Sequence, residues 1–483
     1  MQPLSQNRID KSILALFLFL ATVSAIYAGI YYNVDMDDFY ITMRYAVNLA
    51  EGGGWVFNEG ERVLGTTTPL LTLLIAAFVK TGINAVISVR IICSLALLGT
   101  AIFTFLYFRD KKQLPLGFVA GLLFFFTLPV KQLWGNEIPL CFLFIMGSLY
   151  FYHREKWTAS AVFQCLYALT RMEGVLFFCI LTGILFWKKR KILIGVLIPP
   201  LAILVPWFLF SRFYFGDFFP NTLYAKARQG GETALWDPFS HFFFRTLKLL
   251  FLNKEWPFLS LCAWCGLYPL FRKRHLLLLG WCAIHQAAYW IIGVPGSYEW
   301  YFYPLWLLFP LTMGGGIYLL GLGLKDFREA GKMRILSYSL LGIFLFFQAV
   351  RQPYLNTFYN KRKKTYEKAA DFITENYPAG TDIIADEIGI IGYLLMDYPI
   401  LDTAGLVHRD LPQDAYYNYK YLVQTQKPLL IINNMTGDPE KKEVLEPLLI
   451  SSGDDRYEYR FVRAFPGYRF LVRILERKEK GDL

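Results

Sequence analysis

Long apolar runs separated by short polar loops dominate the first 350 residues of the chain. The first run, residues 13–32, is long enough for a helix to cross the hydrocarbon core of a bilayer. Segment 157–187 is long enough for two short helices that meet at an outer turn. The other runs of spanning length are residues 85–108, 114–130, 137–152, 192–214, 257–271, 276–292, 301–322 and 335–350. The pattern predicts a polytopic α-helical membrane protein with about 11 transmembrane helices, with the shorter run 70–79 at the interface.

The charge pattern supports this interpretation and orients the chain. Hydrophobic residues make up 55% of the sequence, above the roughly 45–50% of soluble domains. The net charge is +11, but much of the excess lies in short loops between apolar runs, which is typical of cytoplasmic loops rather than of nucleic-acid binding. These basic clusters are residues 109–112, 188–191, 272–274 and 325–334. We therefore expect a multi-pass protein of the inner or plasma membrane with a cytoplasmic N-terminus.

The composition changes near residue 352, where the apolar runs end. Alternating and short apolar segments then predict strands, and helical spacing appears between them. The expected strands are residues 382–386, 399–402, 428–433, 457–465 and 468–475, and the expected helices are residues 361–377 and 413–426. We therefore divide the chain into a transmembrane domain, residues 1–351, and a soluble α/β domain, residues 352–483. The alternation of loops places the second domain on the extracytoplasmic side.

Carboxylates cluster in the first outer loop, residues 33–69. Asp35, Asp37 and Asp38 follow the first apolar run directly and precede a short helix expected at residues 38–50. Ionisable groups crowded at the end of a membrane span often line a path or a site. The alternatives are a solvated interfacial turn and, for Asp38, a capping role at the start of the helix.

A second charged pair lies in the middle of an apolar segment. Arg171 and Glu173 interrupt residues 157–187, and they are expected to face protein or water because an unpaired charge is expensive at membrane depth. The seven cysteines fall in or beside apolar runs, so no disulfide framework is indicated. The five histidines have no ligand-spaced companions, so no metal site built by the protein alone is indicated.

Six motifs share one order with a known family. They are DDFYITMRYAVNLAEG at 37–52, GNEIPL at 135–140, TRMEG at 170–174, FGDFFPNTLYAK at 215–226, DEIGIIGY at 386–393 and DTAGL at 402–406. The set resembles bacterial glycosyltransferases with the GT-C fold, in particular the polyprenyl-phosphate-sugar-dependent enzymes around the mycobacterial terminal arabinofuranosyltransferase. More distant similarity extends to the lipid A aminoarabinose transferase and the protein O-mannosyltransferases. Met172 stands where the family usually has proline, and residues 233–333 match only loosely.

The resemblance implies a reaction and roles for single residues. It implies a membrane glycosyltransferase that moves a sugar, with inversion, from a polyprenyl phosphate to an envelope glycan, lipid or protein acceptor. Asp37 or Asp38, with a slight preference for Asp37, is the expected general base. No cofactor is required, although the site is compatible with a divalent cation that bridges Asp37 or Asp38 to the donor phosphate. The residues expected to bind the substrate or its phosphate are Glu137, Arg171, Glu173, Tyr224, Lys226 and Arg228, the last three in outer loop 215–256.

Alternatives remain open at this stage. Arg171 has a purely structural alternative as the partner of Glu173, and Arg228 has one as a solvated loop charge. A transporter or flippase of lipid-linked saccharides is the other function class, although such proteins often show repeated halves and mid-membrane sites. A non-catalytic scaffold that binds cell-wall glycan is the third. The sequence does not specify the sugar or the acceptor.

Overall fold

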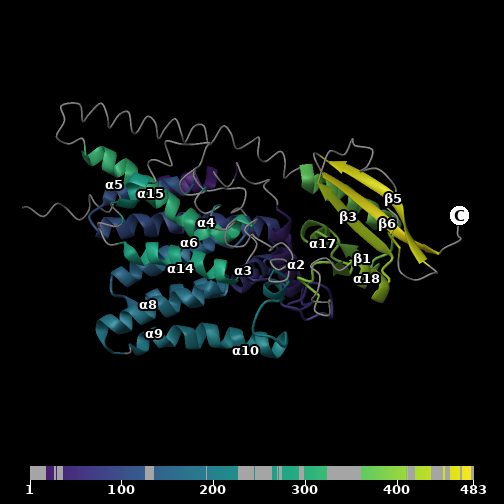
Figure 1. Cartoon of the computed structure of the whole chain (residues 1–483), viewed down its shortest axis with the longest axis horizontal. Helices are drawn as coiled ribbons and strands as arrows, with labels where there is room; N and C mark the ends of the chain where they lie inside the picture. The colour runs from purple at the N-terminus through teal and green to yellow at the C-terminus, as the bar shows by residue number, and fades with distance from the viewer. Residues whose placement is uncertain are drawn as a thin grey trace, which may run out of the picture.

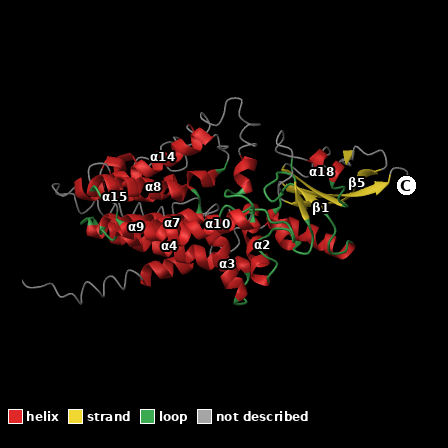
Figure 2. Ribbon diagram, turned by 90° about the horizontal axis from the view of Figure 1, so that it is seen from below, coloured by secondary structure: helices red, strands yellow, loops and turns green. Residues whose placement is uncertain are grey.

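The computed structural model describes residues 18–26, 29, 36–125, 135–191, 193–226, 244, 248, 264–268, 270, 275–292, 298–323, 361–408, 411, 419–436, 450–451, 457–467 and 470–479. Figure 1 shows the helices of the first 323 residues at one end of an elongated molecule and the strands of the C-terminal part at the other. Helix α2 lies between the two parts, and Figure 2 shows the same arrangement from a perpendicular direction. The predicted run 335–350 lies outside the described residues, and runs 13–32 and 257–271 are described only in part.

The helices of the first part follow the apolar runs closely. Segment 157–187 breaks into two helices at Arg171 and Met172, which confirms the predicted turn. Two stretches of the described residues, Ala85–Asp110 and Ile194–Tyr214, are long and apolar enough to cross a membrane. The elements are α2 (Asp37–Glu51), α3 (Pro69–Lys80), α4 (Ala85–Asp110), α5 (Leu114–Leu123), α6 (Ile138–His153), α7 (Trp157–Thr170), α8 (Glu173–Lys189), α9 (Ile194–Pro199), η2 (Pro200–Leu204), α10 (Val205–Tyr214), α14 (Leu276–Ile292), η3 (Glu299–Phe302) and α15 (Tyr303–Gly323).

Local sequence explains the irregular points of these helices. The run from α9 to α10 passes through a π-helical turn at Pro199 and Pro200, because proline has no N–H and its ring crowds the preceding turn. At the α7–α8 turn, a side chain on Gly174 would overlap the backbone of Ala168, so glycine permits the tight approach of the two helices. Helix α4 packs against α5 and α6, and α6 packs against α7, which forms the centre of the bundle.

The C-terminal part is a mixed six-stranded sheet with helices on it. The strand order is β2-β1-β3-β6-β5-β4, with β1 parallel to β2 and β3, and β6 antiparallel to β3 and β5. The predicted strands and the closing hairpin are confirmed within a few residues. The elements are β1 (Ile383–Ala385), α17 (Gly389–Leu394), β2 (Ile400–Asp402), α18 (Tyr419–Thr425), β3 (Leu430–Thr436), β4 (Ile450–Ser451), β5 (Tyr457–Gly467) and β6 (Phe470–Glu479), and residues 361–376 are also helical.

Helix α17 was not predicted from the sequence. It has only six residues, two of them glycine, so it carries too few apolar positions for a helical period to be recognised. The helix packs on α2, and one continuous hydrophobic core joins Phe39 and Met43 of α2 to Ile390 of α17 and Ile400 of β2. The C-terminal part is therefore seated on α2 through buried apolar side chains.

Candidate functional site

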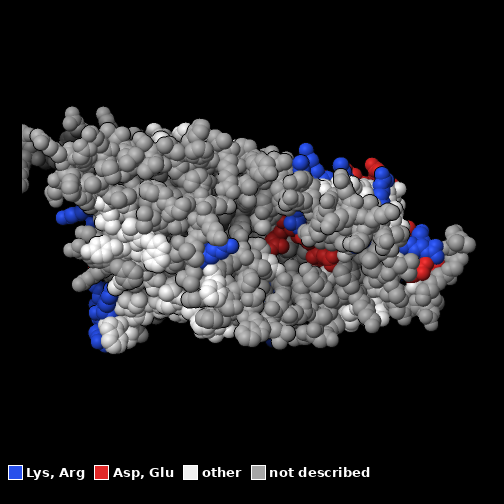
Figure 3. All heavy atoms as spheres, turned by 45° about the horizontal axis from the view of Figure 1, so that its top comes forward, with Lys and Arg blue, Asp and Glu red and all other residues white. Residues whose placement is uncertain are grey.

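A cavity of about 410 Å³ opens at the junction between the helical part and the C-terminal part. Its walls come from α2, the loop before α3, the start of α6, the α7–α8 turn, residues 219–226, α14 and η3. Leu406, in the turn after β2, adds a wall from the C-terminal part. Figure 3 shows acidic and basic side chains together in a hollow on one face of the molecule.

Helix α2 presents Asp38 and Thr42 to this cavity. They are four residues apart, so they lie on one face of the helix. Thr66 Oγ1 lies 3.3 Å from Thr42 Oγ1 and 3.1 Å from Thr68 Oγ1. The Asp38 carboxylate is open to the cavity but closely surrounded by protein, and this desolvation raises its pKa above the ordinary value, against the lowering influence of Lys226.

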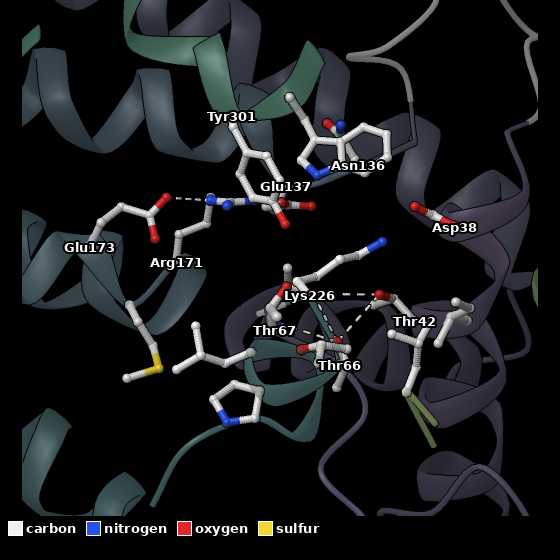
Figure 4. Close-up of a pocket in the computed structure, with 18 of the residues that line it drawn as sticks. Asp38, Thr42, Thr66, Thr67, Asn136, Glu137, Arg171, Glu173, Lys226 and Tyr301 are labelled. Atoms are coloured by element: carbon white, nitrogen blue, oxygen red, sulfur yellow. Dashed lines mark hydrogen bonds and ion pairs between the residues drawn. The ribbon is translucent and has the colours of Figure 1, made fainter. Parts of the chain in front are cut away.

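Lys226 supplies a cation to the same space. Figure 4 shows its side chain extending across the cavity with the amine directed toward Asp38. The amine lies 3.8 Å from the centre of the Tyr298 ring. Burial lowers the pKa of Lys226, but Tyr298 and Asp38 outweigh it, so the pKa is raised and the amine stays charged.

Arg171 lies at the other end of the cavity, held between two acids. Its Nη1 donates to Glu137 Oε1 at 2.5 Å, and its Nε donates to Glu173 Oε1 at 2.6 Å. Its Nη2 donates to the Tyr289 hydroxyl at 3.0 Å, and that hydroxyl donates to Glu173 Oε1 at 2.9 Å. The side chain of Arg171 is only 7% exposed. All three guanidinium nitrogens therefore bond to protein, and two carboxylates offset one positive charge.

Asp37 is adjacent to Asp38 but does not line the cavity. Its Oδ2 accepts a hydrogen bond from the Gly389 amide at 2.9 Å, and its Oδ1 accepts one from the Ile390 amide at 2.7 Å. Burial first, and then the charge of Glu387, raise the pKa of Asp37 to about 7. Both oxygens of this carboxylate are thus engaged by the backbone of α17.

The structure brings together most, but not all, of the residues expected from the sequence. Asp38, Glu137, Arg171, Glu173 and Lys226 line the cavity. Tyr224 is exposed outside it, and its hydroxyl lies 3.5 Å from Asp217 Oδ2. Two further candidates, Asp35 and Arg228, lie outside the described residues.

Several lining residues were not anticipated from the sequence. Three of the threonines stand in the run GTTTP of the first loop. The glycine of this run was the usable signal: a side chain on Gly65 would overlap the Tyr45 hydroxyl and the backbone of Leu406, so the close approach at this point needs glycine. Tyr289 and Tyr301 come from elements more than 100 residues downstream, outside the matched motifs, and the sequence of residues 298–301 indicates only an aromatic cluster typical of a membrane interface. The unanticipated lining residues with polar groups are Thr42, Thr66, Thr67, Thr68, Asn136, Thr222, His285, Tyr289, Trp300 and Tyr301.

One side of the cavity is apolar and continues to the outer surface. Leu176 of α8, Ile292 of α14, Phe219 and Leu223 line the cavity, yet their exposed fractions are 37%, 54%, 43% and 42%. Large apolar side chains exposed around an opening are typical of a surface that contacts lipid or an apolar ligand. A chain that enters here would pass from this apolar opening toward the charged groups.

The described residues contain no group of three or more His, Cys, Asp and Glu side chains suited to a metal ion. Asp38 is the one carboxylate of the predicted pair that faces the cavity. A divalent cation there would need further ligands from a substrate phosphate or from water. The chemistry proposed below is assigned to side chains of the chain itself.

Comparisons with known proteins identify the fold of the chain and match its C-terminal part to a domain family of unknown function. A family described as "Domain of unknown function (DUF8728)" matches residues 355–477. No curated protein matches the sequence. Among solved structures, ArnT from Cupriavidus metallidurans in the apo state aligns with a TM-score of 0.56 at 12% identity, over 96% of this chain and 98% of that one. The Archaeoglobus fulgidus oligosaccharyltransferase tethered to an acceptor peptide aligns with a TM-score of 0.54 at 10% identity, over 86% and 69%.

A further structure of the Archaeoglobus fulgidus oligosaccharyltransferase, in complex with Zn and sulfate, aligns with a TM-score of 0.53 at 10% identity, over 85% of this chain and 67% of that chain. ArnT and the oligosaccharyltransferase are both glycosyltransferases with the GT-C fold. This chain has the same fold, which confirms that part of the resemblance inferred from the motifs. The arabinofuranosyltransferase group is a finer assignment, and at 10–12% identity the likeness establishes only the fold.

Proposed function

We propose that this protein is a membrane glycosyltransferase that transfers a sugar from a polyprenyl phosphate to an envelope glycan, lipid or protein. One observation carries the proposal: the carboxylate of Asp38 and the amine of Lys226 face one cavity that is polar at its centre and apolar at its mouth. Transfer from a lipid phosphate needs a base, a cation for the departing phosphate and an apolar entrance for the lipid. The GT-C fold of the structural neighbours supports the same reaction class.

Asp38 is the proposed general base. It faces the cavity, whereas both oxygens of Asp37 accept hydrogen bonds from backbone amides. A raised pKa makes the Asp38 carboxylate a stronger base than an ordinary aspartate. Asp38 takes the proton of the acceptor hydroxyl, the acceptor oxygen bonds to the anomeric carbon, and the bond from that carbon to the phosphate oxygen breaks. Attack opposite the leaving phosphate gives inversion.

Lys226 is the proposed partner of the leaving phosphate. Its amine lies 3.8 Å from the centre of the Tyr298 ring and is directed into the cavity toward Asp38. Arg171 suits this role less well, because Glu137 and Glu173 already offset its charge. An ammonium at this point stabilises the phosphate most as the glycosidic bond breaks and negative charge develops.

Glu137 and Glu173 are proposed to bind sugar hydroxyls. Each uses Oε1 to accept a hydrogen bond from Arg171, and neither Oε2 accepts one from the described residues. Among the lining residues of the cavity, three are acidic and two are basic, with two of the acids at this end. Carboxylate oxygens accept hydrogen bonds from hydroxyl groups and repel a phosphate. The sugar is therefore oriented toward Arg171 and the phosphate toward Lys226.

The proposal also covers where the isoprenoid chain of the donor lies and on which side of the membrane the cavity opens. The apolar mouth formed by Leu176, Ile292, Phe219 and Leu223 suits the isoprenoid chain, which remains in contact with bilayer lipid. The basic loops predicted to be cytoplasmic put this cavity and the C-terminal part on the extracytoplasmic side of the inner or plasma membrane. The acceptor then comes from the cell envelope.

A release assay tests the function. The purified protein in lipid nanodiscs is incubated with an envelope fraction and a panel of radiolabelled undecaprenyl-phosphate sugars, and free undecaprenyl phosphate and labelled acceptor are measured. We expect one sugar to be transferred by the wild type and by Asp371→Asn, an exposed aspartate in the C-terminal part. Asp38→Asn should abolish transfer. Movement of intact lipid-linked sugar across the bilayer, without release of undecaprenyl phosphate, would instead favour a transporter.

A further inference from the structure

The short helix α17 is held at its N-terminus by Asp37. The two carboxylate oxygens of Asp37 accept the amides of Gly389 and Ile390 at 2.9 and 2.7 Å, which are two of the amides that have no partner within a helix. A side chain on Gly389 would overlap the carbonyl oxygen of Asp37. The contact is therefore a close approach of two backbones that only glycine permits.

Arg44 holds the other end of the same helix. It is 2% exposed, and its Nη1 donates to the carbonyls of Gly392 and Leu395 at 2.5 and 3.1 Å. Its Nη2 donates to the carbonyl of Tyr398 at 3.0 Å. A guanidinium suits this position because it offers several donors and its positive charge is favourable at a helix C-terminus. The last carbonyls of α17 and of the following turn thus converge on one side chain.

The spacing along α2 matches the length of α17. Asp37 and Arg44 are seven residues apart, which is about two helical turns or roughly 10 Å. The six residues of α17 span about 9 Å, so the two side chains bracket it. We call this pair of contacts, Asp37 to the N-terminus and Arg44 to the C-terminus of α17, the α17 clamp. It links two segments about 350 residues apart in sequence.

The α17 clamp is connected to the cavity wall by a second set of polar contacts. Asn58 accepts the amide of Ile400 at 3.0 Å and donates to its carbonyl at 2.9 Å, which fixes the start of β2 to the first outer loop. The turn that follows β2 carries Leu406 into the cavity. Its shape is set by Asp402, which accepts the amides of Ala404 and Val407. The contacts that fix the C-terminal part to α2 and its following loop therefore also support a residue of the cavity wall.

We propose that Asp37 and Arg44 are positioning residues which, by clamping α17, hold Leu406 in the cavity wall. The proposal rests on the proposed function for the identity of the ligand. Asp37 touches no reacting atom in this scheme, and its effect on substrate passes through the docked C-terminal part. The apparent affinity for a donor then falls in proportion to the docked fraction.

Two measurements on the full-length protein in nanodiscs test the proposal. The first is hydrogen exchange of the α17 amides, and the second is the affinity for undecaprenyl phosphate. In Asp37→Asn and in Arg44→Lys, loss of a charge-assisted hydrogen bond should speed exchange across α17 by at least about tenfold, because the helix opens as a unit. The double variant Asp37→Asn/Arg44→Lys should also bind undecaprenyl phosphate at least about tenfold more weakly than the wild type. Asp371→Asn, the matched control, should change neither.

The outcomes separate the alternatives. Faster exchange with unchanged affinity in the double variant would make the clamp purely structural and overturn the positioning role. Weaker binding by Asp37→Asn with unchanged exchange would place Asp37 on the ligand itself, and would overturn it too. Unchanged exchange in both single variants would overturn the clamp. A wild-type protein that fails to bind undecaprenyl phosphate would overturn the proposed donor, whatever the exchange result.

Discussion

Two faces of α2 differ in what they contact, although the residues on them are neighbours in sequence: one contacts α17 and the other borders the cavity. One face carries Asp37, which accepts two backbone amides of α17, and Arg44, which donates to carbonyls of α17 and the following turn and, through Nε, to the carbonyl of Phe57. The other carries Asp38 and Thr42, whose side chains border the cavity. The first face has satisfied, buried hydrogen bonds, and the second keeps groups available for a ligand. Adjacent acids can therefore divide between docking and chemistry.

The physical reason is the helical period. Successive residues point about 100° apart around an α-helix, so the adjacent side chains of Asp37 and Asp38 can face different surroundings. A carboxylate that accepts two backbone amides is oriented and has few lone pairs left for an acceptor hydroxyl. A carboxylate open to a cavity, with a raised pKa, is suited to proton transfer. The comparison makes distinct predictions for each face.

Replacement of Asp38 should have the largest effect. We expect Asp38→Asn to lower kcat by about 10²- to 10⁴-fold with the donor found in the release assay, because it removes the general base. The amide cannot accept the proton from the acceptor hydroxyl. Binding of undecaprenyl phosphate should persist, because Lys226 and the apolar mouth remain.

The same assay applied to Asp37→Asn sharpens the comparison. Its kcat at saturating donor should remain within about tenfold of the wild type, since a docking defect acts mainly on apparent affinity. If Asp37→Asn lowers kcat as far as Asp38→Asn does, the division of α2 into two faces is wrong. Asp371→Asn serves as the control for both substitutions.

Arg171 tests whether the ion-paired cluster that it forms with Glu137 and Glu173 is structural. Arg171→Ala leaves the buried carboxylates of Glu137 and Glu173 without their cation, which should cost about 3–5 kcal/mol of stability. The combination Arg171→Met/Glu137→Gln/Glu173→Gln removes all three charges and should recover most of that stability. Thermal unfolding followed by size-exclusion chromatography measures both effects.

The activity of the stable combination then separates two roles. The proposed sugar contacts of Glu137 and Glu173 predict that the refolded triple variant transfers poorly. Transfer at the wild-type rate would remove all three residues from the substrate site. A stability of Arg171→Ala equal to that of the wild type would instead show that the ion-paired cluster contributes little to the fold.

The sequence predicted the fold better than the division of labour within the site. Apolar runs and basic loops gave the helices, because burial in lipid requires long uncharged segments. Short motifs pointed to Asp38, Arg171 and Lys226. The role of Arg44 could not be predicted, because its carbonyl partners lie about 350 residues downstream and a carbonyl carries no sequence signature.

The same limit explains the preference for Asp37 over Asp38. Resemblance identifies a pair of acids, but only the direction of each side chain relative to α17 and the cavity distinguishes them. Helix α17 itself was invisible because a six-residue helix with two glycines depends on tertiary contacts for its formation. Tyr224 stood within a matched motif, yet the preceding turn carries it to the exposed side.

Lys226 should come next in the size of its effect on rate. We expect Lys226→Met to lower kcat by about 10²- to 10³-fold, the usual loss when one charge-stabilising donor is removed from a transition state. Lys226→Arg should retain more activity because it keeps a positive charge. Lys368→Met, on the exposed side of helical residues 361–376, is the matched control. A Lys226→Met variant with normal kcat and a raised KM would limit Lys226 to ground-state binding.

The pH profile of kcat gives a smaller but directional effect. Asp38 works as a base only when it is deprotonated, so the rate should fall as pH falls through its pKa. Because desolvation raises that pKa, the acid limb should lie above the ordinary value of about 3.9. Lys226 lowers the pKa of Asp38, so the acid limb of the residual activity of Lys226→Met should lie at a still higher pH. An unmoved limb would argue against the Asp38–Lys226 pairing.

The smallest effect is expected at Asn221, which ties the loop bearing Leu406 to the helical part. Its amide nitrogen donates to the carbonyls of Gly405 at 2.6 Å and His408 at 3.1 Å. Asn221→Ala loses these bonds, at a net cost of about 1–2 kcal/mol to the position of the loop. KM for the donor should rise several-fold with kcat nearly unchanged, because the loop forms part of the wall and carries no reacting group.

Asn221→Asp sharpens this last prediction. A carboxylate would face the same carbonyl oxygens with no proton to donate, so the loop should be displaced further and KM should exceed that of Asn221→Ala. Asn376→Ala provides the control, since its exposed amide donates to the carbonyl of Phe372 in its own helix. A kcat loss of about 100-fold or more in Asn221→Ala would mean that Asn221 contacts the substrate, and the polar contacts between the two parts would then extend into the reaction itself.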